Sequence, residues 1–142
     1  TNGIQGLDFI GRKCLRDGGE GLSDLLAEMT ATTQTTSSDC TSINALLSSL
    51  RATIIQCQSA LDHVLANPSN SQFMAYNFMM LFGNSVGYWL LVKLSIAAKS
   101  HIEKGSEDRF YRQKIATTEF FASQLLTRNA GYLGAITGDT QS

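Results

Sequence analysis

Apolar side chains run almost without interruption through residues 73–102, and this stretch dominates the pattern of the chain. No Lys, Arg, Asp or Glu lies between Asp62 and Lys93, and the stretch is apolar on nearly every helical face. As a helix it would be roughly 45 Å long, at about 1.5 Å per residue. A helix that is apolar all round must be enclosed by lipid or by other helices.

Residues 73–92 are long enough to cross a membrane, but two features argue against that interpretation. Polar and glycine residues interrupt the stretch, among them Asn77, Gly83 and Asn84, and no basic cluster at one end would orient it. The other helical segments of the chain also carry apolar stripes that need a partner. We therefore expect a central helix enclosed by helices, and no membrane span.

Two shorter helices are predicted ahead of this stretch. Residues 3–16 repeat apolar side chains at helical spacing, and Asp17-Gly18-Gly19 then ends the helix. A second helix runs from Leu22 to about Thr33, where Thr and Ser become frequent and a frayed or mobile loop is expected to residue 38. The expected apolar positions are Ile4, Leu7, Ile10 or Gly11, Cys14 and Leu15 in the first helix, and Leu22, Leu25, Leu26 and Met29 in the second.

Two long amphipathic helices flank the central one in the sequence. Residues 39–66 carry a heptad-like apolar seam, with Ser38 or Asp39 as the N-cap, and Ser71 caps the central helix that follows. Residues 110–136 form a final long helix. The two seams are Ile43, Leu47, Leu50, Ile54, Cys57, Leu61 and Val64, and then Tyr111, Ile115, Thr118, Ala122, Leu125, Leu133 and Ile136, widened by Phe110, Phe121 and Leu126.

No segment shows the alternation of a strand, and no internal repeat is present. The pattern therefore predicts an all-α fold. It is an antiparallel helical bundle of three long helices with one or two shorter N-terminal helices.

Composition narrows the classes of partner and the compartment. The 142 residues carry a net charge of −1, which gives no general reason to expect nucleic acid as a partner. The three cysteines, an odd number without a Cys-x-x-Cys pair, indicate reduced thiols in the cytoplasm. The first residues do not resemble a secretory signal. A chain that begins with Thr1 rather than Met reads as a fragment or a processed piece.

Side chains that could do chemistry are few and scattered. His63 and His101 lie far apart and outside any metal-binding spacing, so no metal site is expected. Glu119 stands alone on the last helix and is expected to be solvated. The run from Gly18 to Gly21 follows no strand, so it is interpreted as a turn rather than a phosphate loop. No residue of the chain is predicted to be catalytic.

The first residues offer the one candidate binding site. Thr1, Asn2 and Gly3 open directly into a helix, where free backbone N–H groups and the helix dipole favour an anion. Gln5 adds a side-chain donor. On physical grounds alone this signal is weak, because many helices begin in this way.

Several segments resemble large FAD-dependent acyl-CoA dehydrogenases that carry an added helical C-terminal domain, the subgroup that includes methylmercaptopropionyl-CoA dehydrogenases. The opening Thr1-Asn-Gly-Ile-Gln-Gly-Leu-Asp-Phe-Ile-Gly-Arg-Lys-Cys-Leu is similar to the segment that follows their catalytic Tyr-Glu-Gly. The resemblance covers nearly the whole chain, and the part between Thr30 and Leu65 matches only in pattern. The later segments are Leu81-Phe-Gly, Gly87-Tyr-Trp-Leu-Leu, Phe110-Tyr-Arg-Gln-Lys-Ile-Ala-Thr and Phe120-Phe-Ala-Ser-Gln-Leu-Leu.

This resemblance implies a reaction of fatty acid metabolism and a place for the chain in it. In the family a Glu removes a proton from an acyl-CoA thioester, a hydride passes to FAD, and a 2-enoyl-CoA forms. By position Thr1, Asn2 and Gly3 would contact FAD, with Gln5 less certain. The chain begins after the position of that Glu, so the isolated piece is expected to be inactive and to retain no FAD.

The resemblance also implies domains and partners. Residues 1–17 would end the catalytic core, and residues 18–142 would form the appended bundle. Its role would be structural: to pack on the catalytic body of a homo-oligomeric enzyme. The alternative is a stand-alone helical-bundle interaction module with no enzymatic activity.

Overall fold

The computed structural model describes residues 2–35, 40–103 and 108–138, and within these ranges it contains helices and no strand. The predicted all-α fold is therefore confirmed. The elements are α1 (Asn2–Phe9), a π-helical turn (Ile10–Leu15), α2 (Glu20–Thr35), α3 (Thr41–Ala66), a 3-10 turn (Pro68–Asn70), α4 (Ser71–Glu103), α5 (Asp108–Gln124), a 3-10 turn (Leu126–Arg128) and α6 (Asn129–Thr137).

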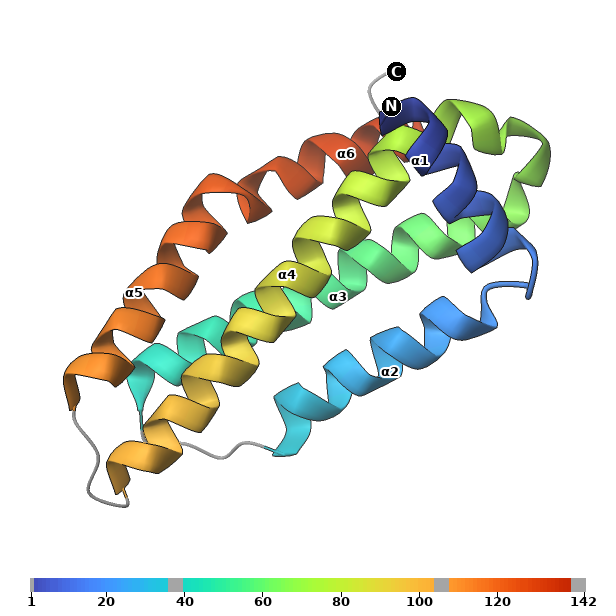
Figure 1. The fold of residues 1–142 in the computed structure, drawn as a ribbon. Coiled ribbons are helices and arrows are strands. Elements are labelled where there is room, and N and C mark those ends of the chain that lie inside the picture. The colour runs from blue at the N-terminus through green and yellow to red at the C-terminus, as the bar shows by residue number, and fades with distance from the viewer. Residues whose placement is uncertain (1, 36–39, 104–107, 139–142) are drawn as a thin grey trace.

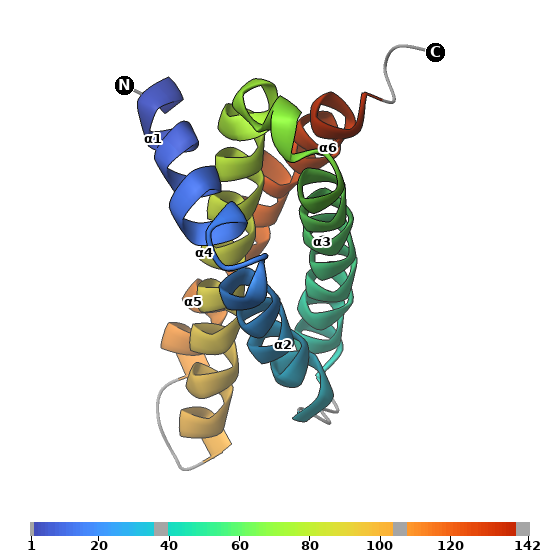
Figure 2. The same cartoon turned by 90° about the vertical axis from the view of Figure 1, so that its right-hand side faces the viewer.

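The long helix predicted at residues 73–102 is α4, and the other helices pack around it. It contacts α1, α3, α5 and α6, and it runs antiparallel to both α3 and α5 (Figure 1). The beginning of α1 and the end of α6 lie at the same end of the bundle (Figures 1 and 2). The sequence pattern thus located the central element, and its neighbours are the helices that the apolar stripes predicted.

Length and composition alone would allow one helix of the described chain to cross a membrane. This helix spans residues 68–101, and 44% of its most apolar window is buried inside the bundle. The core helix of a globular protein passes the same test. Packing by four other helices accounts for much of its apolar surface.

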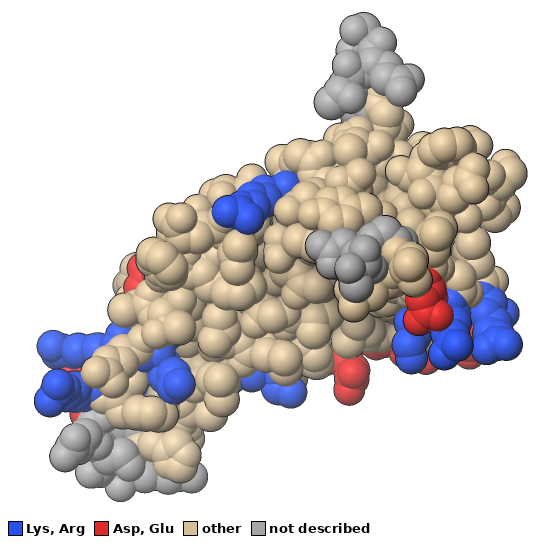
Figure 3. Space-filling view, turned by 45° about the horizontal axis from the view of Figure 1, so that its top comes forward, with Lys and Arg blue, Asp and Glu red and all other residues tan. Residues whose placement is uncertain are grey.

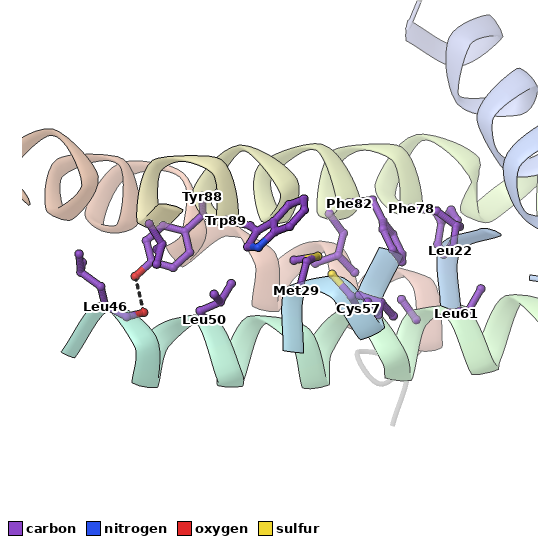
Figure 4. Close-up of a cluster of buried hydrophobic side chains, with 14 of the residues drawn as sticks. Leu22, Met29, Leu46, Leu50, Cys57, Leu61, Phe78, Phe82, Tyr88 and Trp89 are labelled. Carbon is purple, nitrogen blue, oxygen red and sulfur yellow. Dashed lines mark hydrogen bonds between the residues drawn. The ribbon is translucent and has the colours of Figure 1, made fainter. Parts of the chain in front are cut away.

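The apolar seam of α3 packs against α4 and α2. Leu47, Leu50 and Cys57 have almost no exposed surface, so the predicted seam is confirmed, and only Ile54 within it is half-buried. Figure 4 shows Leu50 and Leu61 of α3 pointing towards Phe78, Phe82 and Trp89 of α4, with Leu22 and Met29 of α2 closing one side. This part of the core is therefore shared by α2, α3 and α4.

The threonine-rich end of α2 is more ordered than its composition predicted. The helix continues to Thr35, and residues 36–39 lie outside the described part of the chain. Thr30 and Thr33 donate hydrogen bonds from their hydroxyls to carbonyls of the preceding turn, at 2.8 and 2.7 Å. From other helices, Arg51 donates to the Thr33 carbonyl at 3.0 Å, and the Trp89 indole donates to the Thr32 hydroxyl at 2.9 Å. Tertiary hydrogen bonds thus extend the helix beyond its propensity.

The buried face predicted for residues 3–16 is confirmed in its second half and wrong in its first. Ile10 and Cys14 are buried as expected, whereas Ile4 and Leu7 are exposed and Gly6 is buried. A Cβ atom on Gly6 would lie 2.9 Å from the Ala75 carbonyl oxygen, so the glycine permits a close approach between α1 and α4. Because this close contact sets the orientation of α1, its glycine side faces the bundle and its first two apolar side chains do not.

The last predicted helix is broken in two. Its chain leaves α5 after Gln124, makes a 3-10 turn and continues as α6, so the expectation of one helix over residues 110–136 was wrong. The Asn84 amide of α4 donates to the Leu125 carbonyl at 3.3 Å and to Oδ1 of the fully buried Asn129 at 3.4 Å. Asn129 in turn donates to the Ser85 hydroxyl at 3.3 Å. Side chains of another helix therefore satisfy the backbone at the break.

The predicted helix starts also need correction. Cys40 is the N-cap of α3, with extended backbone angles (φ −83°, ψ 113°), so the cap is neither Ser38 nor Asp39, which lie outside the described residues. Ser71 has helical angles (φ −56°, ψ −33°) and is the first residue of α4 rather than its cap. The 3-10 turn after Pro68 runs directly into α4, which leaves no extended residue to act as a cap.

Candidate functional site

The predicted anion site lies at the start of α1. Asn2 and Gly3 are the first residues of this helix, and Thr1 lies outside the described part of the chain. The first N–H groups of a helix have no partner within it, so the backbone at Asn2 and Gly3 has the polarity that an anion requires. Gln5 is exposed to solvent. The contact of these residues with FAD stays a prediction.

Packing on α4 fixes the direction in which this helix start points. The Phe9 ring lies 5.6 Å from the Phe78 ring and 6.1 Å from the Phe82 ring, measured between centroids. Gly6 brings the two helix backbones together one turn earlier. These two contacts hold α1 against α4 close to the helix start.

The glycine-rich run after the first helix is a structural turn, as the sequence indicated. Gly18 and Gly19 have positive φ angles of 67° and 83°, which favour glycine. The Asp17 carboxylate accepts hydrogen bonds from the backbone N–H groups of Gly19 at 3.0 Å and Gly21 at 2.9 Å. These N–H groups are therefore occupied by the carboxylate at the start of α2.

Sequence reasoning missed a cluster around Cys40. Its Sγ lies 2.8 Å from the Tyr111 hydroxyl oxygen of α5, and the Lys99 ammonium of α4 lies 5.7 Å from the centroid of the Tyr111 ring. The cluster joins the start of α3 to two helices that are distant in sequence. The available signal was weak, because a cysteine at a helix N-cap is recognised only when the exact helix start is known.

Electrostatics sets Cys40 apart from the other two cysteines. Burial raises its pKa, but the hydrogen bond with Tyr111, the N–H groups of Ile43 and Ser42 and the positive charge of Lys99 outweigh burial, so the pKa falls below its ordinary value of 9.0. By contrast, burial raises the pKa of Tyr111 above its ordinary value, and the hydrogen bond with Cys40 raises it more. Either the Tyr111 hydroxyl or the Cys40 thiol can donate this hydrogen bond.

The remaining cysteines are core residues. Cys14 and Cys57 have no exposed surface, and all three cysteines are free thiols. Burial, with the negative charge of Asp17, raises the pKa of Cys14 to about 11. Burial also raises the pKa of Cys57 to about 11, although the hydrogen bond with Ser85 acts in the opposite direction. Both are therefore protonated and unreactive at neutral pH.

The other titratable side chains are dispersed over the surface. His101 and Glu119 are exposed, His63 is half-buried, and Asp108 forms an exposed ion pair with Arg112 at 2.7 Å. Within the described ranges, no three His, Cys, Asp or Glu residues are close enough to hold a metal ion. Glu119 lines an open groove of about 350 Å³ between α3 and α5, as a solvated carboxylate at its rim.

Comparison with known proteins gives two matches. A model of the family described as Acetyl-CoA dehydrogenase C-terminal like matches residues 25–142. The chain is also 34% identical, over 134 residues, to 3-methylmercaptopropionyl-CoA dehydrogenase of Ruegeria pomeroyi (strain ATCC 700808 / DSM 15171 / DSS-3). That alignment covers 89% of this chain and 22% of the relative, so the chain spans about a fifth of the length of the curated relative it matches.

Proposed function

Because the chain belongs to the Acetyl-CoA dehydrogenase C-terminal like family, we propose that it is the C-terminal helical part of an FAD-dependent acyl-CoA dehydrogenase. The match to the family over residues 25–142 is the observation that carries this proposal. The similarity to 3-methylmercaptopropionyl-CoA dehydrogenase supports it from a second direction. The complete enzyme would convert an acyl-CoA thioester into the 2-enoyl-CoA in the cytoplasm.

The role of this part within the enzyme is structural. The bundle packs on the catalytic body and contributes to the interface between subunits of a homo-oligomer. Proton abstraction and most of the binding of FAD and CoA belong to residues of the body.

One part of the chain fits a contact with the cofactor. The start of α1 presents the backbone N–H groups of Asn2 and Gly3, which suit a negatively charged group such as the phosphates of FAD. When bound, FAD supplies the hydride acceptor. Asn2 and Gly3, with Thr1 before them, would hold it in place, and the contact of Gly6 and Phe9 with α4 would keep this helix start in position.

The coding sequence directly upstream of Thr1 tests the proposal most cheaply. We expect Tyr-Glu-Gly immediately before Thr1, preceded by a catalytic body of several hundred residues. A start codon for Met directly before Thr1, with no coding sequence upstream, would contradict the proposal. The stand-alone helical interaction module would then be the better account.

Flavin binding by the isolated 142-residue chain tests the division of roles. We expect titration with FAD to leave the absorption and fluorescence of the flavin unchanged, because most of the FAD site belongs to the catalytic body. Tight binding of one FAD per chain would show that this division is wrong.

A further inference from the structure

The outer side of α4 carries a second apolar seam that the described helices cover only in part, since Phe121 of α5 lies against Gly87. Its positions step by three and four residues alternately, the spacing of a helix-packing seam. Leu90 and Leu94 are about half exposed, and Phe73 is 74% exposed. Large exposed apolar patches mark interaction sites more often than chance surface. The α4 seam consists of Phe73, Tyr76, Met80, Gly83, Gly87, Leu90, Leu94 and Ala97.

This seam faces away from the core. Phe78, Phe82 and Trp89 point from α4 towards α3 and α2 (Figure 4). The seam residues alternate with them along the helix, at positions that lie on the opposite side by helical periodicity. One helix thus carries two apolar faces, which explains why its sequence is apolar nearly all round although helices enclose only part of it.

No charge interrupts the α4 seam. None of its eight residues is charged, and no Lys, Arg, Asp or Glu lies between Asp62 and Lys93. In Figure 3 basic groups gather at the lower left and the lower right, and between them lies a broad area of uncharged residues with one basic group near its upper edge. An uncharged seam matches the apolar stripe of another helix rather than a charged ligand.

Small residues at the middle of the seam allow close approach. A Cβ atom added to Gly83 would meet no other atom within 4 Å, so open space lies over this position. Gly87, one turn later, leaves room for the Phe121 ring, which would be 3.1 Å from an added Cβ. Gly83 is therefore the open position in the middle of the seam, and the Phe121 ring borders it at Gly87. A small residue at the contact lets a crossing helix come close.

We propose that the α4 seam docks on an apolar helix of the catalytic body of the same polypeptide. This inference rests on the proposed function and adds to it the surface by which the bundle attaches. From residue 73 to residue 97 the seam is about 36 Å long, at about 1.5 Å per residue, which is enough for a helix to pack along it or across its centre.

Two observations favour the catalytic body as the occupant. The chain corresponds to only 22% of the dehydrogenase it resembles, so most of such a polypeptide lies outside it. Its first helix packs on α4 at Ala75, between Phe73 and Tyr76 of the seam, and any chain that precedes α1 therefore arrives beside the seam. Tethering at this point raises the effective concentration of the body at the seam far above that of a second copy.

Hydroxyl-radical footprinting of the full-length enzyme tests the docking. The rate of modification of Tyr76, Leu90 and Leu94 is normalised to the intrinsic reactivity of each residue type. Two internal references calibrate it: Ile55, which is 70% exposed on α3, and Phe82, which is 2% exposed in the core. We expect the three seam residues to lose reactivity to the level of Phe82, while Ile55 stays fully reactive. Seam residues that react as Ile55 does would overturn the proposal.

A pair of variants supplies an independent readout. Leu90→Lys in the full-length enzyme should increase the rate at which limited proteolysis releases the C-terminal bundle, and Ile55→Lys should not. Equal rates for the two variants would contradict docking through the seam. Protection of the seam that appears only as the enzyme is concentrated into a larger oligomer would assign the seam to a second copy and would also overturn the proposal.

The same full-length enzyme, mixed with acyl-CoA, distinguishes a failure of the docking proposal from a failure of the proposed function. If acyl-CoA reduces the flavin while the seam residues remain reactive, the proposed function stands and the docking surface is wrong. If the full-length protein contains no flavin, the proposed function fails irrespective of the footprint.

Discussion

Leu50 lies at the middle of the α3 seam and has no exposed surface. Truncation to alanine removes buried methyl groups and leaves a cavity, so Leu50→Ala should lower the free energy of unfolding by about 2–5 kcal/mol. Ile55→Ala on the same helix is the matched control, because Ile55 is 70% exposed. Its effect should be within about 0.5 kcal/mol of zero. Urea melts measure both, and similar losses for the two variants would show that the seam is not the buried face.

The three cysteines show what residue type and spacing alone can and cannot predict. The absence of pairing motifs indicated free thiols, and Cys57 was expected in the core, where it lies. The lowering of the Cys40 pKa was not predicted. It depends on Tyr111 and Lys99, which are at least 59 positions away in the chain, and on the backbone N–H groups at the start of α3. Long-range electrostatics of this kind follows from the fold and not from local pattern.

Among the helices, the contact between α1 and α4 is controlled by one glycine. A Cβ on Gly6 would meet the Ala75 carbonyl oxygen at 2.9 Å, whereas a Cβ on Gly11 would meet nothing within 4 Å. Gly6→Ala should therefore lower the free energy of unfolding by about 1–3 kcal/mol, as overpacking does. Gly11→Ala has room and gains helix propensity, so it should leave stability unchanged or raise it.

Chemical melts of the isolated chain compare the two variants directly. If Gly6→Ala is as stable as Gly11→Ala, α1 does not pack closely on α4. The start of α1 would then have no fixed position relative to the bundle.

The spacing of apolar residues correctly predicted a helix whose buried residues form one continuous face. It failed where contacts with another helix determine the structure. The α3 seam was predicted correctly because its buried residues recur at helical spacing. The burial of Ile4 and Leu7 was predicted wrongly, because Gly6, which carries no hydrophobic signal, makes the contact of α1 with α4. The break between α5 and α6 depends on Asn84 and Ser85 of α4, so no pattern within residues 110–136 could reveal it. Asn2 and Gly3 lie at a helix start, as the sequence predicted, and their contact with FAD stays a prediction.

In the whole molecule, α4 has two roles, one for each of its sides. The composition of its sequence does not distinguish between them. Its inner side organises α1, α2, α3, α5 and α6 into one core, directly or through their shared contacts. Its outer side leaves an uncharged seam exposed between the charged ends of the bundle (Figure 3).

The central claim is that this bundle belongs to a flavoenzyme that oxidises acyl-CoA thioesters. Anaerobic addition of saturated acyl-CoA thioesters of short, medium and long chain to the full-length protein tests it most directly, with the absorption of oxidised flavin as the readout. We expect at least one thioester to bleach this absorption as the flavin accepts a hydride. A full-length protein without flavin, or a bound flavin that stays oxidised with every thioester, would contradict the claim.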